Sequence, residues 1–227
     1  ANLVSKERLR RGICSRHIFL GDYVDGWSQS AQVIDYLIEL SSYNKCIFIK
    51  GNHDVWCEQW LAEGSVNDVW YVHGGKETME SYEGFSKTQK QVHLDFFEAM
   101  PLYHIDDENR LFLHAGFTSM HGVRKEIHRE AFYYDRTLWE MALTMDKRIQ
   151  QSSELFPNRL KHYKEIYIGH TPTTRFNKYD PMQAANVWNI DTGAAFKGAV
   201  SIIDVNTKDV WQSDPVMSLY PDESGRN

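Results

Sequence analysis

The 227-residue sequence has few cysteines and no long apolar run. Its cysteines, Cys14, Cys46 and Cys57, are odd in number and lack paired spacing, which favours free thiols in a reducing compartment over a disulfide framework. No apolar run approaches the roughly 18 residues of a transmembrane helix. The chain opens with neither an initiator Met nor a signal-type apolar run, so we expect a cytoplasmic protein.

Positive charge is also in short supply. There are 25 Lys and Arg residues against 31 Asp and Glu, which gives a formal net charge of −6. General nucleic-acid binding needs a basic face and is therefore not expected. The acidic balance would also repel a polyphosphate unless a local positive site, such as a bound metal ion, reverses it. No linker or repeat divides the chain, so we expect a single domain over residues 1–227.

What the sequence does contain is four short apolar runs that each end abruptly in small or polar residues. They are residues 17–20, 46–49, 111–113 and 166–168. Continuous β-branched and aromatic runs of this length predict buried strands. Residues 30–40 carry apolar side chains at helical spacing, so the first two strands and this segment predict a βαβ unit.

The remaining segments predict further helices and an antiparallel ending. Helices are expected over residues 88–99 and 136–151. Three short strands are expected in the tail, over residues 186–190, 199–205 and 209–211. The segment 56–82 contains three glycines and is predicted to be rich in loops.

A side chain able to bind metal follows each of the four predicted strands: Asp22, Asn52, His114 and His170. In open α/β sheets, ligands bind beyond the carboxyl ends of the strands. One carboxylate, one amide oxygen and two imidazoles form a mixed oxygen and nitrogen set. Such a set suits Mn, Fe, Zn or Ni rather than Ca or a sulfur-loving metal.

The motifs around these residues resemble, in the same order, those of the calcineurin-like metallophosphoesterase superfamily. They are Gly21-Asp22-Tyr23-Val24-Asp25-Gly26, Gly51-Asn52-His53-Asp54, His114-Ala115-Gly116 and Gly169-His170-Thr171. More narrowly, the chain is similar to the prokaryotic branch of the phosphoprotein-phosphatase family, which includes bacterial and phage Ser/Thr phosphatases and symmetrical dinucleoside tetraphosphatases. Residues 74–78 and 189–193 resemble further elements of that branch. The resemblance implies an α/β fold in which mixed β-sheets form a sandwich flanked by helices.

The resemblance also implies a role for each matching residue. Asp22 would bridge two divalent transition metal ions, with Mn expected first, and Asn52, His114 and His170 would complete the shell of the second ion. The ions would supply a hydroxide for in-line attack on phosphorus. His53 would protonate the leaving oxygen as general acid, and Asp25 would orient His53.

The sequence departs from the family pattern at its start. The family begins with an Asp-x-His motif that supplies two ligands of the first metal, and no Asp precedes Gly21 in this sequence. We expect this motif, and the strand that carries it, upstream of residue 1. Residues 1–16 would then be the remnant of the following helix.

A second departure concerns the substrate phosphate. The family motif continues Asp-Arg-Gly, whereas Asp25 is followed by Gly26. That arginine normally holds the phosphate as a bidentate fork, so another cation is needed. Lys50 and Arg136 resemble substrate-side cations of the branch, although Lys is a point charge rather than a planar fork.

Three functions remain open from the sequence. The first is a phosphatase acting on phosphoprotein Ser/Thr or small phosphomonoesters, and the second is a dinucleoside polyphosphate hydrolase with the same chemistry. The third is a non-catalytic phosphate-binding scaffold that has lost the first metal. His53 and Asp25 argue against the scaffold, because they serve proton transfer rather than metal binding.

Overall fold

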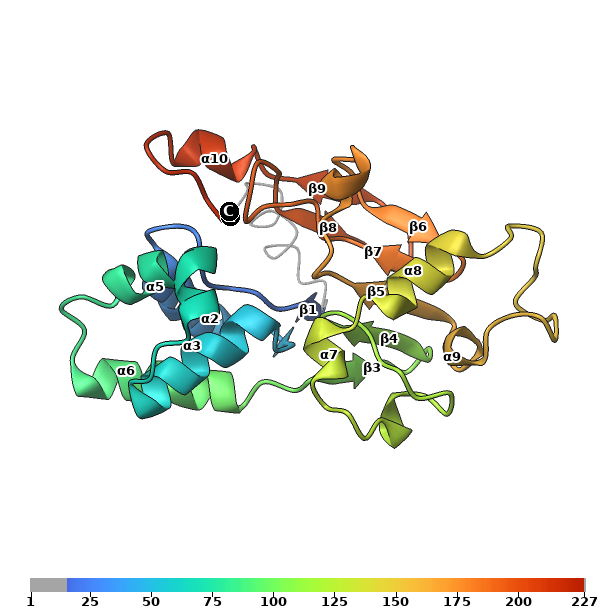
Figure 1. Cartoon of the computed structure of the whole chain (residues 1–227), viewed down its shortest axis with the longest axis horizontal. Coiled ribbons are helices and arrows are strands. Elements are labelled where there is room, and N and C mark those ends of the chain that lie inside the picture. Colours follow the sequence, from blue (N-terminus) through green and yellow to red (C-terminus); the bar gives the residue numbers. More distant parts are fainter. Residues whose placement is uncertain (1–15, 227) are drawn as a thin grey trace.

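The computed structural model describes residues 16–226 of the chain. The expected helix over residues 1–16 therefore lies outside the described residues, apart from its last position. Helices α2, α3, α5 and α6 gather at one side of the molecule, and the larger sheet lies at the other (Figure 1). The first strand, β1 (His17–Phe19), runs between these two parts.

The predicted βαβ unit is confirmed. Helix α2 (Ser30–Tyr43) connects β1 to β2 (Cys46–Phe48), and the two strands pair in parallel with His17 opposite Cys46. Helix α2 buries Ala31, Ile34 and Leu37 along one face, whereas Val33, one of the apolar residues from which this helix was predicted, is exposed.

The other predicted strands belong to a mixed sheet and a hairpin. The five-stranded sheet has the order β3-β4-β5-β7-β6, in which β4, β5 and β7 are parallel and the edge strands antiparallel. Its strands are β3 (Tyr103–Ile105), β4 (Arg110–Leu113), β5 (Glu165–Ile168), β6 (Met182–Ala184) and β7 (Val187–Asn189). The hairpin consists of β8 (Ser201–Ile203) and β9 (Val210–Gln212). The mixed α/β architecture expected from the sequence is thus confirmed.

The prediction that residues 56–82 are rich in loops was wrong. The segment is largely helical, and its elements are α3 (Asn52–Glu63), α4 (Asp68–Trp70), the π-helical turn η1 (Tyr71–Gly75) and α5 (Lys76–Ser81). Gly64 ends α3 with φ +73°, whereas Gly74 lies at a kink inside η1 and Gly75 at the end of that turn. The indole of Trp70 is fully buried against Trp60, with ring centroids 5.9 Å apart, and this packing overrides weak local propensity.

The predicted helix over residues 88–99 is confirmed as α6 (Lys87–Glu98), whereas the one over 136–151 is shorter than expected. Helix α8 (Thr137–Thr144) ends early because the Asp146 carboxylate accepts a hydrogen bond from the Arg148 backbone and forms a turn that competes with the helix. The remaining short elements are η2 (Val123–Lys125), α7 (Ala131–Tyr134), α9 (Asn158–Lys161), η3 (Thr173–Phe176) and α10 (Val216–Leu219).

Apolar packing joins the parallel pair of β1 and β2 to the five-stranded sheet. Ile49, Phe112 and Tyr167 form a buried cluster that also contacts Ile18 from β1 and Ile47 from β2. One larger cluster lies between the five-stranded sheet and α8, and another among α2, α3 and α6. Because the small cluster ties β1 and β2 to β4 and β5, the carboxyl ends of these four strands meet in one place.

The cysteines and the lack of a membrane-spanning helix among the described residues agree with what the sequence led us to expect. Cys46 and Cys57 are free thiols, and Cys14 lies outside the described residues. Within residues 16–226, every helix is too short or too polar to span a bilayer.

Candidate active site

The four residues expected to bind metal converge at the meeting point of the strands. The Asn52 Oδ1 atom lies 3.2 Å from His114 Nε2 and 2.9 Å from His170 Nδ1. The Asp22 Oδ1 atom lies 3.4 Å from His114 Nε2. Each of the four residues follows its own strand, β1, β2, β4 or β5, and so the two sheets together build this cluster.

The backbone at this cluster is locally strained. Asp22, Asp25 and His170 adopt positive φ angles of 60°, 82° and 65°, a region that non-glycine residues rarely occupy. Such strain costs on the order of 1–3 kcal/mol per residue and tends to occur at functional sites. Gly51 has no room for a side chain, because a Cβ atom there would collide with the Asp22 carboxylate. The glycine therefore permits the close approach of the first two strand ends.

Asp54 ties these strand ends together, a role that the sequence did not reveal. Its carboxylate accepts hydrogen bonds from the backbone N–H groups of Gly51 (2.7 Å), Asp22 (2.7 Å) and Tyr23 (2.9 Å). Burial and then the neighbouring Asp22 carboxylate raise the pKa of Asp54. The fixed donors orient this carboxylate and hold the Asp22 backbone in place.

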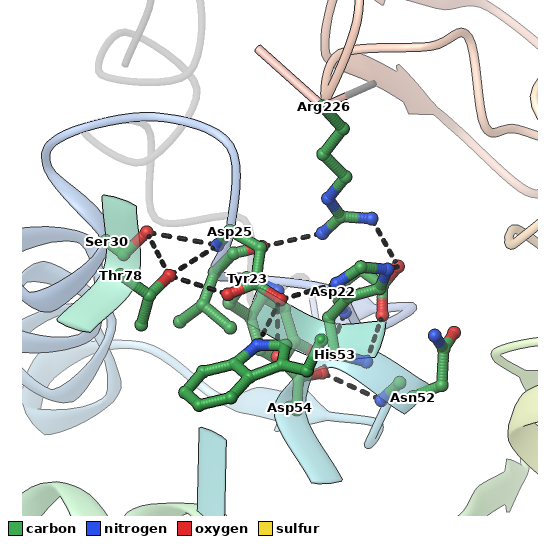
Figure 2. A network of polar contacts seen from close by, with 12 residues as sticks. Asp22, Tyr23, Asp25, Ser30, Asn52, His53, Asp54, Thr78 and Arg226 are labelled. Atoms are coloured by element: carbon green, nitrogen blue, oxygen red, sulfur yellow. Dashed lines mark hydrogen bonds and ion pairs between the residues drawn. The ribbon is translucent and has the colours of Figure 1, made fainter. Parts of the chain in front are cut away.

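His53 and Asp25 form a buried pair beside the four converging residues. His53 Nδ1 lies 2.5 Å from Asp25 Oδ2, and His53 Nε2 lies 4.0 Å from Asp22 Oδ2. Asp25 also accepts hydrogen bonds from Trp70 Nε1 (2.8 Å) and from Thr78 Oγ1 (2.6 Å). Figure 2 shows the contact with Thr78. With Nδ1 engaged by Asp25, the Nε2 atom of His53 is the one that faces the cluster.

Arg226 is the second residue that sequence reasoning missed. Its guanidinium donates hydrogen bonds to Asp22 Oδ2 (2.9 Å) and to the Val24 carbonyl (2.6 Å) (Figure 2). Burial alone would raise the pKa of Asp22, but His114, His53 and Arg226 outweigh it and hold this pKa well below its ordinary value. No motif marked Arg226, because it lies near the end of the sequence and far from the other site residues.

The two expected substrate-side cations occupy different surroundings. Lys50 is buried, and its Nζ atom lies 2.5 Å from Glu58 Oε2, so its charge is already paired. Arg136 lies at the N-terminus of α8. Burial, then His114, and more weakly Arg136 lower the pKa of His170 to about 2.

The donor set fits a divalent transition metal. His170 Nε2 is buried and has no hydrogen-bond partner among residues 16–226, so its ring nitrogen is available to a ligand. The low pKa keeps this imidazole neutral, which is the form that binds metal. In the described part of the chain, His, Cys, Asp and Glu side chains alone form no metal-binding group of three or more. The set of Asp22, Asn52, His114 and His170 therefore depends on the Asn52 carboxamide oxygen.

The fold and this site define a metallophosphoesterase. Residues 6–195 match the family described as Calcineurin-like phosphoesterase, which is most of the chain. The chain belongs to the calcineurin-like phosphoesterase family and is a phosphoester hydrolase that uses divalent metal ions.

Curated relatives and solved structures agree with this assignment. Bis(5'-nucleosyl)-tetraphosphatase PrpE of the asymmetrical type, from Anoxybacillus flavithermus, is 29% identical over 195 residues, covering 82% of this chain and 73% of the relative. The protein of the same name from Bacillus cereus is 29% identical over 194 residues, covering 81% and 72%. A metallophosphoesterase from Sphaerobacter thermophilus shares the fold, with a TM-score of 0.51, 18% identity, and coverage of 96% of this chain and 86% of that one.

Proposed function

We propose that the chain hydrolyses dinucleoside polyphosphates by cleaving a phosphoanhydride bond. The relatives named above are dinucleoside tetraphosphatases, and their names specify the asymmetrical type, whereas the sequence motifs suggested the symmetrical enzymes. The observation that carries the proposal is an aromatic wall beside the phosphate site, formed by Trp56 and Tyr134.

This aromatic wall lies against the proposed general acid His53 and the proposed metal ligand His170. The Trp56 ring centroid is 4.9 Å from that of His53 and 6.1 Å from that of Tyr134. Tyr134 lies 6.4 Å from His170 and is 38% exposed, so its ring is open to a ligand. Nucleobases stack on aromatic side chains, at about 1–3 kcal/mol per base. A phosphoserine side chain has no such face, and the wall therefore favours a nucleotide.

The proposed mechanism assigns a task to each side chain. Asp22, Asn52, His114 and His170 would hold divalent transition metal, for which we propose Mn²⁺, with Asp22 bridging a second ion. Bound there, the metal supplies Lewis acidity and lowers the pKa of water. His53 Nε2 donates a proton to the leaving nucleotide oxygen. Asp25 fixes the imidazole through Nδ1 so that Nε2 carries that proton. Arg136 and Lys50 remain the substrate-side cations proposed from the sequence.

A phosphomonoesterase is the second candidate function. An alkoxide leaves poorly without a proton, and the buried pair of His53 and Asp25 suits a reaction that needs strong general acid catalysis. Phosphoprotein Ser/Thr and small phosphomonoesters are the substrates of this alternative. For either function we propose the cytoplasm as the compartment, because Cys46 and Cys57 are free thiols.

Product analysis with the Mn²⁺-loaded protein tests the proposal. Diadenosine tetraphosphate should yield AMP and ATP if cleavage is asymmetrical and two ADP if it is symmetrical. The kcat/KM for this substrate should exceed that for a phosphoserine peptide. Tyr134→Ala should raise KM for the dinucleotide about tenfold, from the loss of one stacked base. Tyr134→Phe is the matched control and should retain the wild-type KM. A higher kcat/KM for the peptide would favour the phosphomonoesterase instead.

A further inference from the structure

The C-terminal segment 220–226 docks on the loop 26–29 that follows Asp25. The Trp27 and Tyr220 rings stack with centroids 5.1 Å apart. The Glu223 carboxylate accepts hydrogen bonds from the Ser28 backbone (2.9 Å) and the Ser28 hydroxyl (2.5 Å). The Tyr220 hydroxyl donates to Gln29 Oε1 at 2.8 Å. The segment is therefore held by apolar, charged and neutral contacts together.

This docking inserts the Arg226 side chain into the site. The side chain is only 8% exposed, and its guanidinium contacts Asp22 and Val24 through its two Nη atoms. The Nε atom is buried and has no hydrogen-bond partner within the described residues. An unsatisfied buried N–H on a cation is costly, and it indicates an acceptor that residues 16–226 do not supply.

Gly26 makes room for this arginine. It has φ +88°, and a Cβ atom there would lie 2.8 Å from both the Cγ and the backbone N of Arg226. Any larger residue at position 26 would displace the tail. Gly26 also occupies the position at which the family motif places its phosphate-binding arginine. The loop thus lacks this arginine, and the Cγ and backbone N of Arg226 lie where a side chain at position 26 would begin.

We propose that Arg226 binds the substrate phosphate, as a substrate-positioning residue delivered by the C-terminal segment. The Asp22 carboxylate lies 2.9 Å from the guanidinium and the Asp25 carboxylate is held beside it by His53, so a phosphate dianion entering this acidic site needs a compensating cation. Lys50 and Arg226 are each paired with one carboxylate, but Arg226 also has a buried Nε–H without a partner among residues 16–226. The planar fork of Arg226 can present Nε–H and one Nη–H to two phosphate oxygens. This inference rests on the proposed function, because it takes the substrate to carry a phosphoryl group.

Kinetics and direct phosphate binding test this role. Arg226→Ala should raise KM for diadenosine tetraphosphate about 10- to 100-fold, the range expected for losing hydrogen bonds to a charged group. Arg226→Lys, which keeps the charge but not the fork, should fall between Arg226→Ala and wild type. Titration of the Mn²⁺-loaded proteins with inorganic phosphate should show a loss of affinity by a similar factor. Arg148→Ala is the matched control, because Arg148 is 90% exposed and pairs only with nearby Asp146.

Release of the tail supplies an independent variant. Glu223→Ala removes the carboxylate that holds Ser28 without altering the guanidinium, and it should reproduce part of the KM rise.

Two results with Arg226→Ala would overturn the proposal. If this variant increases kcat/KM and tightens Mn²⁺ binding, the arginine inhibits the enzyme by competing with metal for Asp22, and the proposal fails. It also fails if KM and phosphate affinity stay unchanged while Tm falls, since Arg226 would then be a structural anchor. A wild-type protein that binds phosphate through Arg226 but hydrolyses no phosphoanhydride would overturn the proposed function alone.

Discussion

At the scale of single residues, Asp25 shows how neighbours define a side chain's role. Its carboxylate contacts His53, Trp70 and Thr78, and these three partners come from α3, α4 and α5. The indole N–H and the hydroxyl fix the carboxylate, so it can orient the imidazole with little freedom of its own. Thr78 belongs to an element that the sequence singled out, but its contact with Asp25 became visible only in the fold.

Replacement of His53 by Asn tests the general acid. We expect kcat to fall about 10²–10⁴-fold on an alkyl phosphomonoester, the usual scale for lost general acid catalysis. The loss should be much smaller on para-nitrophenyl phosphate, whose leaving oxygen departs without a proton. Steady-state kinetics on both substrates measure the difference. His121→Asn is a control at an exposed histidine outside the site. Equal losses on the two substrates would contradict the assigned role.

At the scale of elements, a single carboxylate organises the loop that follows β4. Glu126 Oε2 accepts hydrogen bonds from the Thr118 backbone (2.5 Å), the Thr118 hydroxyl (2.9 Å) and the Ser119 backbone (2.8 Å). Its Oε1 accepts one from the His128 backbone at 2.9 Å. Burial opposes ionisation, but these donors outweigh it and lower the pKa of Glu126 from 4.5 to about 2.

This shift predicts a pH-dependent contribution to stability. Because the folded-state pKa is depressed, Glu126 stabilises the protein fully above pH 4.5, and the contribution is lost as the pH falls towards about 2. Glu126→Gln should therefore lower the free energy of unfolding at pH 7, and the difference from wild type should shrink below about pH 4.5. Urea denaturation of both proteins at several pH values measures this difference. A difference that is constant with pH would show that ionisation of Glu126 is irrelevant.

At the scale of the whole molecule, we expect activity to depend on metal bound where the β1–β2 pair meets the five-stranded sheet. Treatment with excess chelator followed by dialysis should abolish hydrolysis, and Mn²⁺ should restore it. Mn²⁺ should restore it better than Ca²⁺, because the set of Asp22, Asn52, His114 and His170 mixes oxygen and nitrogen donors. Metal binding to the native state should also raise Tm as the Mn²⁺ concentration increases. Undiminished activity in excess chelator would refute a metal-dependent reaction.

The helical segment after Asn52 marks a limit of prediction from sequence. Its glycines suggested loops, because local propensity is all that a short window of sequence contains. Burial of Trp70 and the contact of Thr78 with Asp25 stabilise helices there instead. The positions of the strands that lead into the site were predictable because their signal is local. A short apolar run that ends in a polar residue indicates both that the strand is buried and where it ends.

The sequence by itself determined the four strands that lead into the candidate site, the chemical types of the side chains at their ends and the family that these motifs resemble, but not the edge strands β3 and β6. Such information is local, since each candidate ligand directly follows the run that forms its strand. Only the tertiary structure decided which distant groups meet. Arg226 and Asp22 are 204 residues apart in sequence, and their ion pair depends on the path of the whole chain and on the space left by Gly26. Contacts of this kind have no local pattern, because packing rather than propensity brings their members together.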